Sequence, residues 1–248
     1  MIFRTSDGSS TPSITRMAMF ALVHGAWYGA WCWESLTPLL QRAGHDVAAM
    51  DLPCDDAAAS LDTYADVVCA ALDGCDDDVV LVGHSMGGGT LPLVAARRPV
   101  RHLIYVCGFV PEVGRSVFDQ WRENPDMLNP ACMAGLKDDG QSQTWVDLEL
   151  ARVILWADCD KATSDAAVSR LRPQAHYPSS LAFTLAELPS VRTTSVVCSD
   201  DRLLNIEWSR RIARDQLGAD PVELPGSHSP FLSRPSALAD VLLHLAEM

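Results

Sequence analysis

A serine between glycines carries the clearest chemistry in this chain. Residues 83–87 read Gly-His-Ser-Met-Gly, a G-x-S-x-G pattern that presents a nucleophilic serine on a sharp turn. The apolar residues 79–82 before it indicate a short buried strand, and residues 90–97 after it indicate a helix. Glycine suits so tight a turn because it has no Cβ to clash. The sequence therefore predicts Ser85 as a nucleophile; the competing interpretation is a glycine-rich loop that only ends a core strand.

A nucleophilic serine needs hydrogen-bond donors for the oxyanion that forms when it attacks a carbonyl group. The loop His24-Gly25-Ala26-Trp27 follows a strand predicted at 18–23. A small residue after glycine lets its backbone N–H approach a carbonyl oxygen, so we predict that the N–H groups of Ala26 and Met86 form an oxyanion hole. We interpret His24 as a structural polar group that supports this loop.

An acid and a histidine follow later in the chain, each after a predicted strand. Asp200 and Asp201 come after the strand predicted at 194–198, and His228 lies in a loop rich in Gly, Ser and Pro. Because ligands and reactive groups gather at the carboxyl ends of parallel strands, we expect these residues near Ser85. The chain order Ser, Asp, His is one known order of a catalytic triad. The residues alone leave Asp200 and Asp201 as competing acids.

Strands and helices alternate through most of the chain, and this alternation predicts the frame that positions the loops. It is typical of an α/β fold with a doubly wound, mostly parallel sheet. We expect a core formed by residues 18–110 and 190–248. Residues 111–189 contain no evident strand and are expected to form an inserted helical cap, and residues 1–17 a flexible N-terminal tail.

Composition narrows the classes of function. A net charge of −13 argues against nucleic acid and anionic membranes as partners, and no apolar run is long enough to span a membrane. The eight cysteines form no C-x-x-C pair, so we expect reduced thiols in a cytoplasmic protein, with no metal and no cofactor. Acidic runs at 76–78 and 138–139 are expected to be solvated turns. His84 adjoins Ser85 in sequence, so its side chain should point elsewhere.

These features together resemble the α/β-hydrolase family, in particular its branch of methylesterases, hydroxynitrile lyases and pyrethroid hydrolases. The resemblance covers nearly the whole chain from about Met19 on. It is carried by the residues 22–27, 29–31, 83–88, 110–111 and 226–230. It implies the α/β-hydrolase fold with an inserted helical cap. It also implies Asp201 as the triad acid, because family members place that acid at this point after the penultimate strand.

Two positions narrow the chemistry that the resemblance implies. Similar hydroxynitrile lyases carry Thr after the oxyanion-loop His and Lys after the triad His, whereas this chain has Gly25 and Ser229 there. Epoxide hydrolases and haloalkane dehalogenases of this fold use an Asp nucleophile, and this chain has a serine. We therefore expect a serine carboxylic-ester hydrolase with the catalytic residues Ser85, Asp201 and His228.

The expected substrate is a small to medium apolar or aromatic ester, because the predicted cap is rich in Trp and Met. The candidate pocket residues are Trp27, Phe109, Trp121, Trp145 and Trp156. One alternative is the same triad used for lactone opening, C–C bond hydrolysis or acyl transfer in secondary metabolism. Another is a receptor-like relative that binds a ligand without turnover. Whether the protein forms a homodimer is open at this point.

Overall fold

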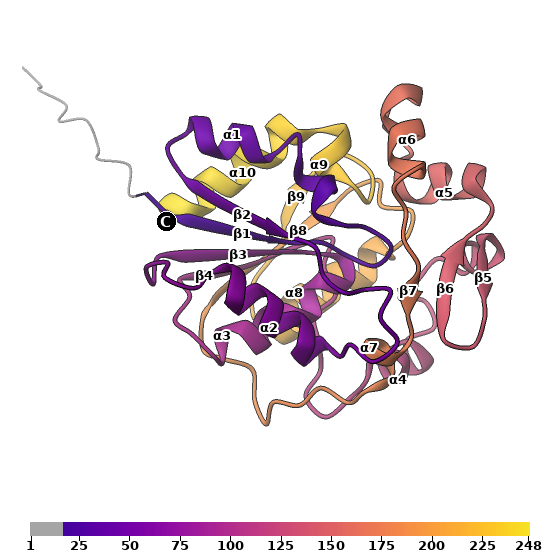
Figure 1. Ribbon diagram of the computed structural model, residues 1–248, viewed down its shortest axis with the longest axis horizontal. Helices are drawn as coiled ribbons and strands as arrows, with labels where there is room; N and C mark the ends of the chain where they lie inside the picture. The colour runs from indigo at the N-terminus through magenta and orange to yellow at the C-terminus, as the bar shows by residue number, and fades with distance from the viewer. Residues whose placement is uncertain (1–16) are drawn as a thin grey trace, which may run out of the picture.

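The computed structural model describes residues 17–248, so the predicted tail lies outside the described residues except for Met17. The central strands are β1 (Met19–Val23), β2 (Asp46–Met50), β3 (Val79–His84), β4 (His102–Val106), β8 (Arg192–Cys198) and β9 (Val222–Leu224). They form one six-stranded sheet in the order β2-β1-β3-β4-β8-β9, and each neighbouring pair is parallel (Figure 1). This sheet confirms the predicted fold class.

Helices cover both faces of the sheet, as a doubly wound fold requires. One face carries α1 (Thr37–Arg42), α9 (Pro230–Ser233) and α10 (Pro235–Glu247) (Figure 1). The other face carries α2 (Leu61–Ala71), α3 (Leu91–Ala95) and α8 (Ile206–Leu217).

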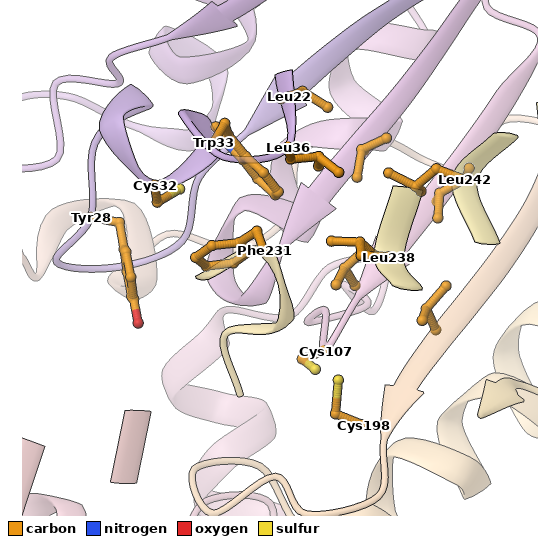
Figure 2. Packing of buried hydrophobic residues seen from close by; sticks show 14 of the residues in the cluster. Leu22, Tyr28, Cys32, Trp33, Leu36, Cys107, Cys198, Phe231, Leu238 and Leu242 are labelled. Carbon is orange, nitrogen blue, oxygen red and sulfur yellow. The ribbon is translucent and has the colours of Figure 1, made fainter. Parts of the chain in front are cut away.

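Alternate residues of each strand enter two separate hydrophobic cores. On β1, Phe20 and Leu22 pack in the cluster that includes α1 and α10, whereas Ala21 and Val23 pack in the cluster that includes α2 and α8. Figure 2 shows the first cluster, with Leu22 of the sheet and Leu238 of α10 among its members. Because a strand's side chains point to opposite faces in turn, a strand buried on both faces reads as a continuous apolar run.

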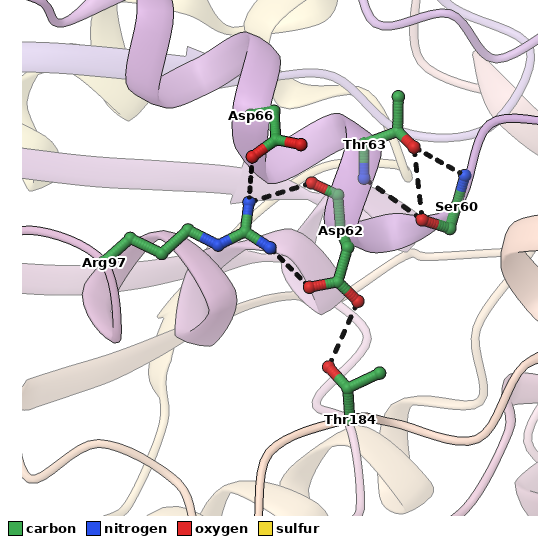
Figure 3. A network of polar contacts seen from close by, with 6 residues as sticks. All are labelled: Ser60, Asp62, Thr63, Asp66, Arg97 and Thr184. Carbon is green, nitrogen blue, oxygen red and sulfur yellow. Dashed lines mark hydrogen bonds and ion pairs between the residues drawn. The ribbon is translucent and has the colours of Figure 1, made fainter.

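A polar network aligns the start of α2 with the end of α3. The hydroxyl of Ser60 accepts the N–H of Thr63 at 3.1 Å, which caps α2. Arg97, just beyond α3, binds Asp62 and Asp66 of α2 (Figure 3). These partly exposed ion pairs are worth about 0–1 kcal/mol each, so the network mainly sets geometry.

Residues 111–189 are not purely helical, and the expectation that they contain no strand is wrong. Their helices are α4 (Val117–Glu123), η3 (Pro130–Gly135), α5 (Leu148–Leu155), α6 (Lys161–Val168) and α7 (Tyr177–Ser180). Their strands β5 (Leu136–Asp138), β6 (Ser142–Trp145) and β7 (Gln174–Ala175) form a three-stranded antiparallel sheet. Strands of two to four residues are too short to show an alternating pattern. We propose that this segment caps the carboxyl edge of the main sheet.

Two further features bear on the expectations from composition. In residues 17–248, no helix combines the length and apolar character needed to cross a membrane. All eight cysteines lie in this part of the chain, and each is a free thiol. The acidic run at Asp138 and Asp139 ends β5 and begins the loop to β6, in which the Asp139 carboxylate accepts the backbone N–H groups of Gln141 and Ser142.

Candidate active site

Ser85 lies directly after β3, at the start of the 3₁₀ helix η2 (Ser85–Thr90) that leads into α3. Its φ of 49° falls in the left-handed region, which is strained for a residue with a side chain. The turn is crowded, since a Cβ added at Gly87 would lie 2.4 Å from the carbonyl oxygen of His24. The N–H of Phe109 binds the Ser85 carbonyl at 2.9 Å. The predicted strand, sharp turn and helix are therefore all present.

The loop after β8 brings one of the two competing aspartates to His228. Asp201 Oδ2 lies 2.8 Å from His228 Nδ1, and the two side chains are almost fully buried. The other oxygen of Asp201 accepts the N–H groups of Leu203 and Leu204 at 2.8 and 3.0 Å, which fixes the carboxylate. Asp200 is exposed and its carboxylate instead binds the hydroxyl of Ser199. Only Asp201 is placed to orient the histidine.

The electrostatics of His228 follow from this pairing. Burial by itself lowers the pKa of His228, but attraction to Asp201 and their hydrogen bond outweigh burial and raise this pKa above its ordinary value. The other ring nitrogen, Nε2, is buried and has no hydrogen-bond partner among the described residues. Nε2 is thus the nitrogen left to exchange a proton with a nucleophile.

His84 points away from the nucleophile, as its sequence position predicts. Its Nε2–H donates to the backbone carbonyl of His228 at 3.0 Å, so the residue before Ser85 supports the loop that carries His228. Its ring lies in a pocket of aromatic side chains, edge-on to Tyr28 and Phe231. Burial lowers the pKa of His84 well below its usual range, so the ring is neutral.

The loop after β1 packs closely against Ser85. A Cβ added at Gly25 would lie 2.7 Å from the Cβ of Ser85, so only glycine permits this approach. Ala26 and Met86 line the same cavity as Ser85. His24 accepts the N–H of Leu52 at 2.9 Å and binds the Gly25 carbonyl at 2.8 Å. Burial lowers its pKa to about 4, which agrees with the interpretation of a neutral structural residue.

A buried hydrogen bond joins this loop to the histidine loop. The hydroxyl groups of Tyr28 and Ser229 lie 2.7 Å apart, and both residues are almost completely buried. Tyr28 comes two residues after Ala26, and Ser229 directly follows His228. The backbone segments on either side of Ser85 are therefore tied to each other as well as to β3.

A cavity of about 110 Å³ opens above Ser85, between the sheet edge and residues 111–189. Of the predicted pocket residues, Trp27, Phe109 and Trp121 line it. The other two tryptophans, Trp145 and Trp156, are not among the residues that line this cavity. Trp145 packs edge-on behind Trp27, with ring centroids 5.6 Å apart, and Trp156 is buried against Tyr28. Both belong to the hydrophobic cluster that also contains Phe20 and Leu22 of β1, and the sequence pattern does not distinguish such burial from a pocket role.

Most of the remaining lining was not predicted. Apolar groups dominate it, and the side chains of this kind are Val117, Phe118, Met127, Leu128, Cys132, Met133, Leu136, Leu203 and Leu204. Gln143, Gln174 and Ser179 add polar atoms. A wider hollow of about 530 Å³ adjoins the cavity and shares with it Phe118, Trp121, Leu128 and Met133. The clustering of Phe, Trp and Met between residues 118 and 133 was the available signal, but it did not show which side chains face inward.

Comparison with known proteins places these features in context. A family model described as "Alpha/beta hydrolase family" matches residues 20–241. Norfluorocurarine synthase 2 from Strychnos sp is 27% identical and Methylesterase 2 from Arabidopsis thaliana 26% identical, each over 94% of this chain and 97% of its own. The pyrethroid hydrolase from Sphingobium faniae JZ-2 has a similar fold, with a TM-score of 0.78, 22% identity, and coverage of 94% of this chain and 98% of its own.

Proposed function

The chain belongs to the alpha/beta hydrolase family, and from that premise we propose that it is a serine carboxylesterase with Ser85 as its nucleophile. Relatives that are named esterases support the class of reaction. The observation that carries the catalytic assignment is the buried 2.8 Å contact between Asp201 and His228, at the sheet edge where Ser85 occupies a strained turn. The expected branch of methylesterases and pyrethroid hydrolases agrees with the relatives.

In the proposed reaction, Nε2 of His228 takes the proton of the Ser85 hydroxyl as Oγ attacks the ester carbonyl carbon. Asp201 holds the imidazole in the tautomer that accepts this proton and stabilises the imidazolium that forms. The backbone N–H groups of Ala26 and Met86 bind the oxyanion, and each such donor is typically worth about 3–4 kcal/mol. His228 then protonates the leaving alcohol, and water cleaves the acyl-enzyme by the same route.

The two adjoining spaces support an ester with one small side and one larger apolar side. The cavity of about 110 Å³ next to Ser85 accepts only a compact group. The adjoining hollow of about 530 Å³ is lined by Phe118, Trp121 and Met133 and offers room for a bulkier apolar or aromatic part. Apolar walls with a few polar groups are the usual make-up of a small-molecule site.

A second use of the same residues is favoured by one of the comparisons. Norfluorocurarine synthase 2 is named as a synthase rather than as an esterase. The same serine and histidine can serve acyl transfer, lactone opening or C–C bond hydrolysis, because each of these reactions also begins with attack on a carbonyl group. Assays on a panel of esters therefore test the main proposal. If the protein bound ligands but hydrolysed none of the esters, it would be a receptor-like relative.

The test compares hydrolysis of p-nitrophenyl acetate and butyrate by the wild type, Ser85→Ala and Ser195→Ala. Ser195 is a buried serine of β8 outside the residues that line the cavity, so it is a matched control for folding. Removing the nucleophile should lower kcat by at least about 10⁴-fold, whereas the control should keep most of the activity. Undiminished hydrolysis by Ser85→Ala would exclude Ser85 as the nucleophile.

A further inference from the structure

Cys107 occupies an unusual backbone position beside the Asp201–His228 pair. It directly follows β4 and has a φ of 44°, although it is not a glycine. Its N–H donates to the carbonyl of Val196 at 2.9 Å, so β8 holds it in this conformation. The side chain is buried, with 2% exposure, and lies close to that of Cys198 (Figure 2). Strain at a non-glycine residue next to reactive groups indicates a functional constraint.

The neighbourhood of Cys107 contains three different donor atoms. The Cys107 sulfur, a ring nitrogen of His228 and a carboxylate oxygen of Asp201 all lie within 4.8 Å of one another. Thiolate, imidazole and carboxylate are the ordinary protein ligands of zinc. His228 Nδ1 lies 2.8 Å from Asp201 Oδ2, so it is the ring nitrogen that faces the carboxylate and belongs to this group of donor atoms. The proposed ester hydrolysis makes no use of Cys107.

We propose that Cys107, Asp201 and His228 form a binding site for a thiophilic divalent cation such as Zn²⁺ or Cd²⁺, and that the bound ion inhibits hydrolysis. The inhibition rests on the proposed roles of Asp201 and His228. On binding, the Cys107 thiol releases one proton to solvent and its sulfur bonds the metal. The carboxylate and Nδ1 of His228 then also bind the ion, and the imidazole proton moves from Nδ1 to Nε2, so Nε2 can no longer accept the proton of Ser85.

Charge and geometry together set the expected strength of this site. One thiolate and one carboxylate balance the two positive charges, and this neutrality matters because the site is buried. Ligand atoms around tetrahedral zinc lie about 3.4 Å apart, given metal–ligand distances of about 2.0–2.3 Å. The present spread of up to 4.8 Å means that the Cys107 sulfur must move inward. The site is therefore weaker than a preformed structural zinc site, and the inhibition is reversible by a chelator.

The first experiment measures inhibition of p-nitrophenyl butyrate hydrolysis by Zn²⁺ in the wild type, Cys107→Ser and Cys132→Ser. Cys132 is a buried thiol that lines the cavity but is not one of the three grouped ligands, so it is the matched control. Cys107→Ser should raise the half-inhibitory Zn²⁺ concentration at least about tenfold, because it removes one ligand. Cys132→Ser should leave that concentration unchanged, and EDTA should restore activity. Equal inhibition of Cys107→Ser and the wild type would overturn the proposal.

A second measurement does not depend on ester hydrolysis. Cd²⁺ binding to a thiolate gives an ultraviolet charge-transfer band, which is recorded for the wild type, Ser85→Ala, Cys107→Ser and Cys107→Ala. The band should be equal in the wild type and Ser85→Ala and should lose the same component in both Cys107 variants. If no ester is hydrolysed but this component is present, the metal site stands and the proposed function fails. If both Cys107 variants keep the full band, the metal site is wrong whatever the activity.

Discussion

The carboxyl edge of the main sheet and the cap segment, residues 111–189, are held together in different ways. At the sheet edge, backbone atoms almost touch, since a Cβ at Gly87 would lie 2.4 Å from a carbonyl oxygen. In the cap segment, Ser116 caps α4 and an exposed ion pair joins Asp119 to Arg122, and a Cβ at Gly140 would have no atom within 4 Å. We infer that the sheet edge fixes the proposed reacting groups, whereas residues 111–189 can vary and set the choice of substrate.

The largest loss of activity is expected on substitution of Asp201. Asp201→Asn should lower kcat by about 10⁴-fold, because the amide favours the wrong tautomer of His228. Asp200→Asn is the matched control, since Asp200 is exposed and its carboxylate binds the hydroxyl of Ser199. Steady-state kinetics on p-nitrophenyl butyrate would show the difference. A larger loss at Asp200 would contradict the assignment of the acid.

The same variants have an expected pH dependence. Because Asp201 raises the pKa of His228, the neutral base forms only at higher pH, and kcat/KM should rise along an alkaline-shifted limb. Any residual activity of Asp201→Asn should have this limb at lower pH, whereas Asp200→Asn should keep the wild-type profile. An unchanged midpoint in Asp201→Asn would mean that the carboxylate does not control the imidazole.

The next largest effect is expected at the glycines. Gly87→Ala should lower kcat/KM about a hundredfold or more, because His24 must shift and the oxyanion loop with it. Gly140→Ala in the cap should leave kcat/KM nearly unchanged and reduce the free energy of unfolding by about 1 kcal/mol, since its φ of 86° suits glycine. Kinetics and urea unfolding of both variants check this. If Gly87→Ala and Gly140→Ala lowered kcat/KM equally, the sheet edge and the cap segment would not differ in how tightly they hold the reacting groups.

A cap variant should change selectivity rather than the chemical step. Leu128 lines both the cavity and the adjoining hollow, so Leu128→Ala should join the two spaces. We expect kcat/KM for p-nitrophenyl octanoate to rise about tenfold relative to the acetate. Val153→Ala, at an exposed position of α5, is the control and should keep the wild-type ratio. A fall in activity on the acetate alone would indicate that Leu128 supports the reacting groups instead.

Another expected effect concerns acid stability at the sheet edge. His24 is buried neutral with its pKa lowered to about 4, so the unfolded chain takes up a proton more readily than the folded one. The stability linked to His24 is present above the unfolded pKa of about 6.5, is lost as the pH falls through about 4, and amounts to on the order of 3 kcal/mol. Urea unfolding across this range should show a smaller pH dependence for His24→Asn. Equal pH dependence in His24→Asn and the wild type would contradict this assignment.

The sequence predicted the sheet edge far better than the cap, for a physical reason. Strands buried on both faces must be apolar throughout, and tight turns need glycine, so β3 and the turn at Ser85 can be recognised from residue types alone. The choice of Asp201 as the acid needed the family resemblance, because Asp200 and Asp201 are adjacent in the loop and carry the same carboxyl group. That its side chain rather than that of Asp200 reaches His228 depends on backbone geometry that residue types do not encode.

The cap could not be predicted in the same detail. A strand of two residues such as Gln174–Ala175 has no period, so the small antiparallel sheet was missed. Trp145 and Trp156 are buried, as large apolar residues usually are, but burial alone does not say whether a ring faces a ligand or a neighbouring ring. Trp121 and Trp145 illustrate this, since both are cap tryptophans and only the first lines the cavity.

The hydrogen bond from His84 to the carbonyl of His228 provides the protein with an internal spectroscopic reporter. Its Nε2–H proton is buried and bonded, so it exchanges slowly with water and is visible by proton NMR in ¹⁵N-histidine-labelled protein. The chemical shift of this proton depends on the length of the bond. Movement of the His228 loop during a catalytic cycle can therefore be followed at a residue that takes no part in the chemistry, without a label on the substrate.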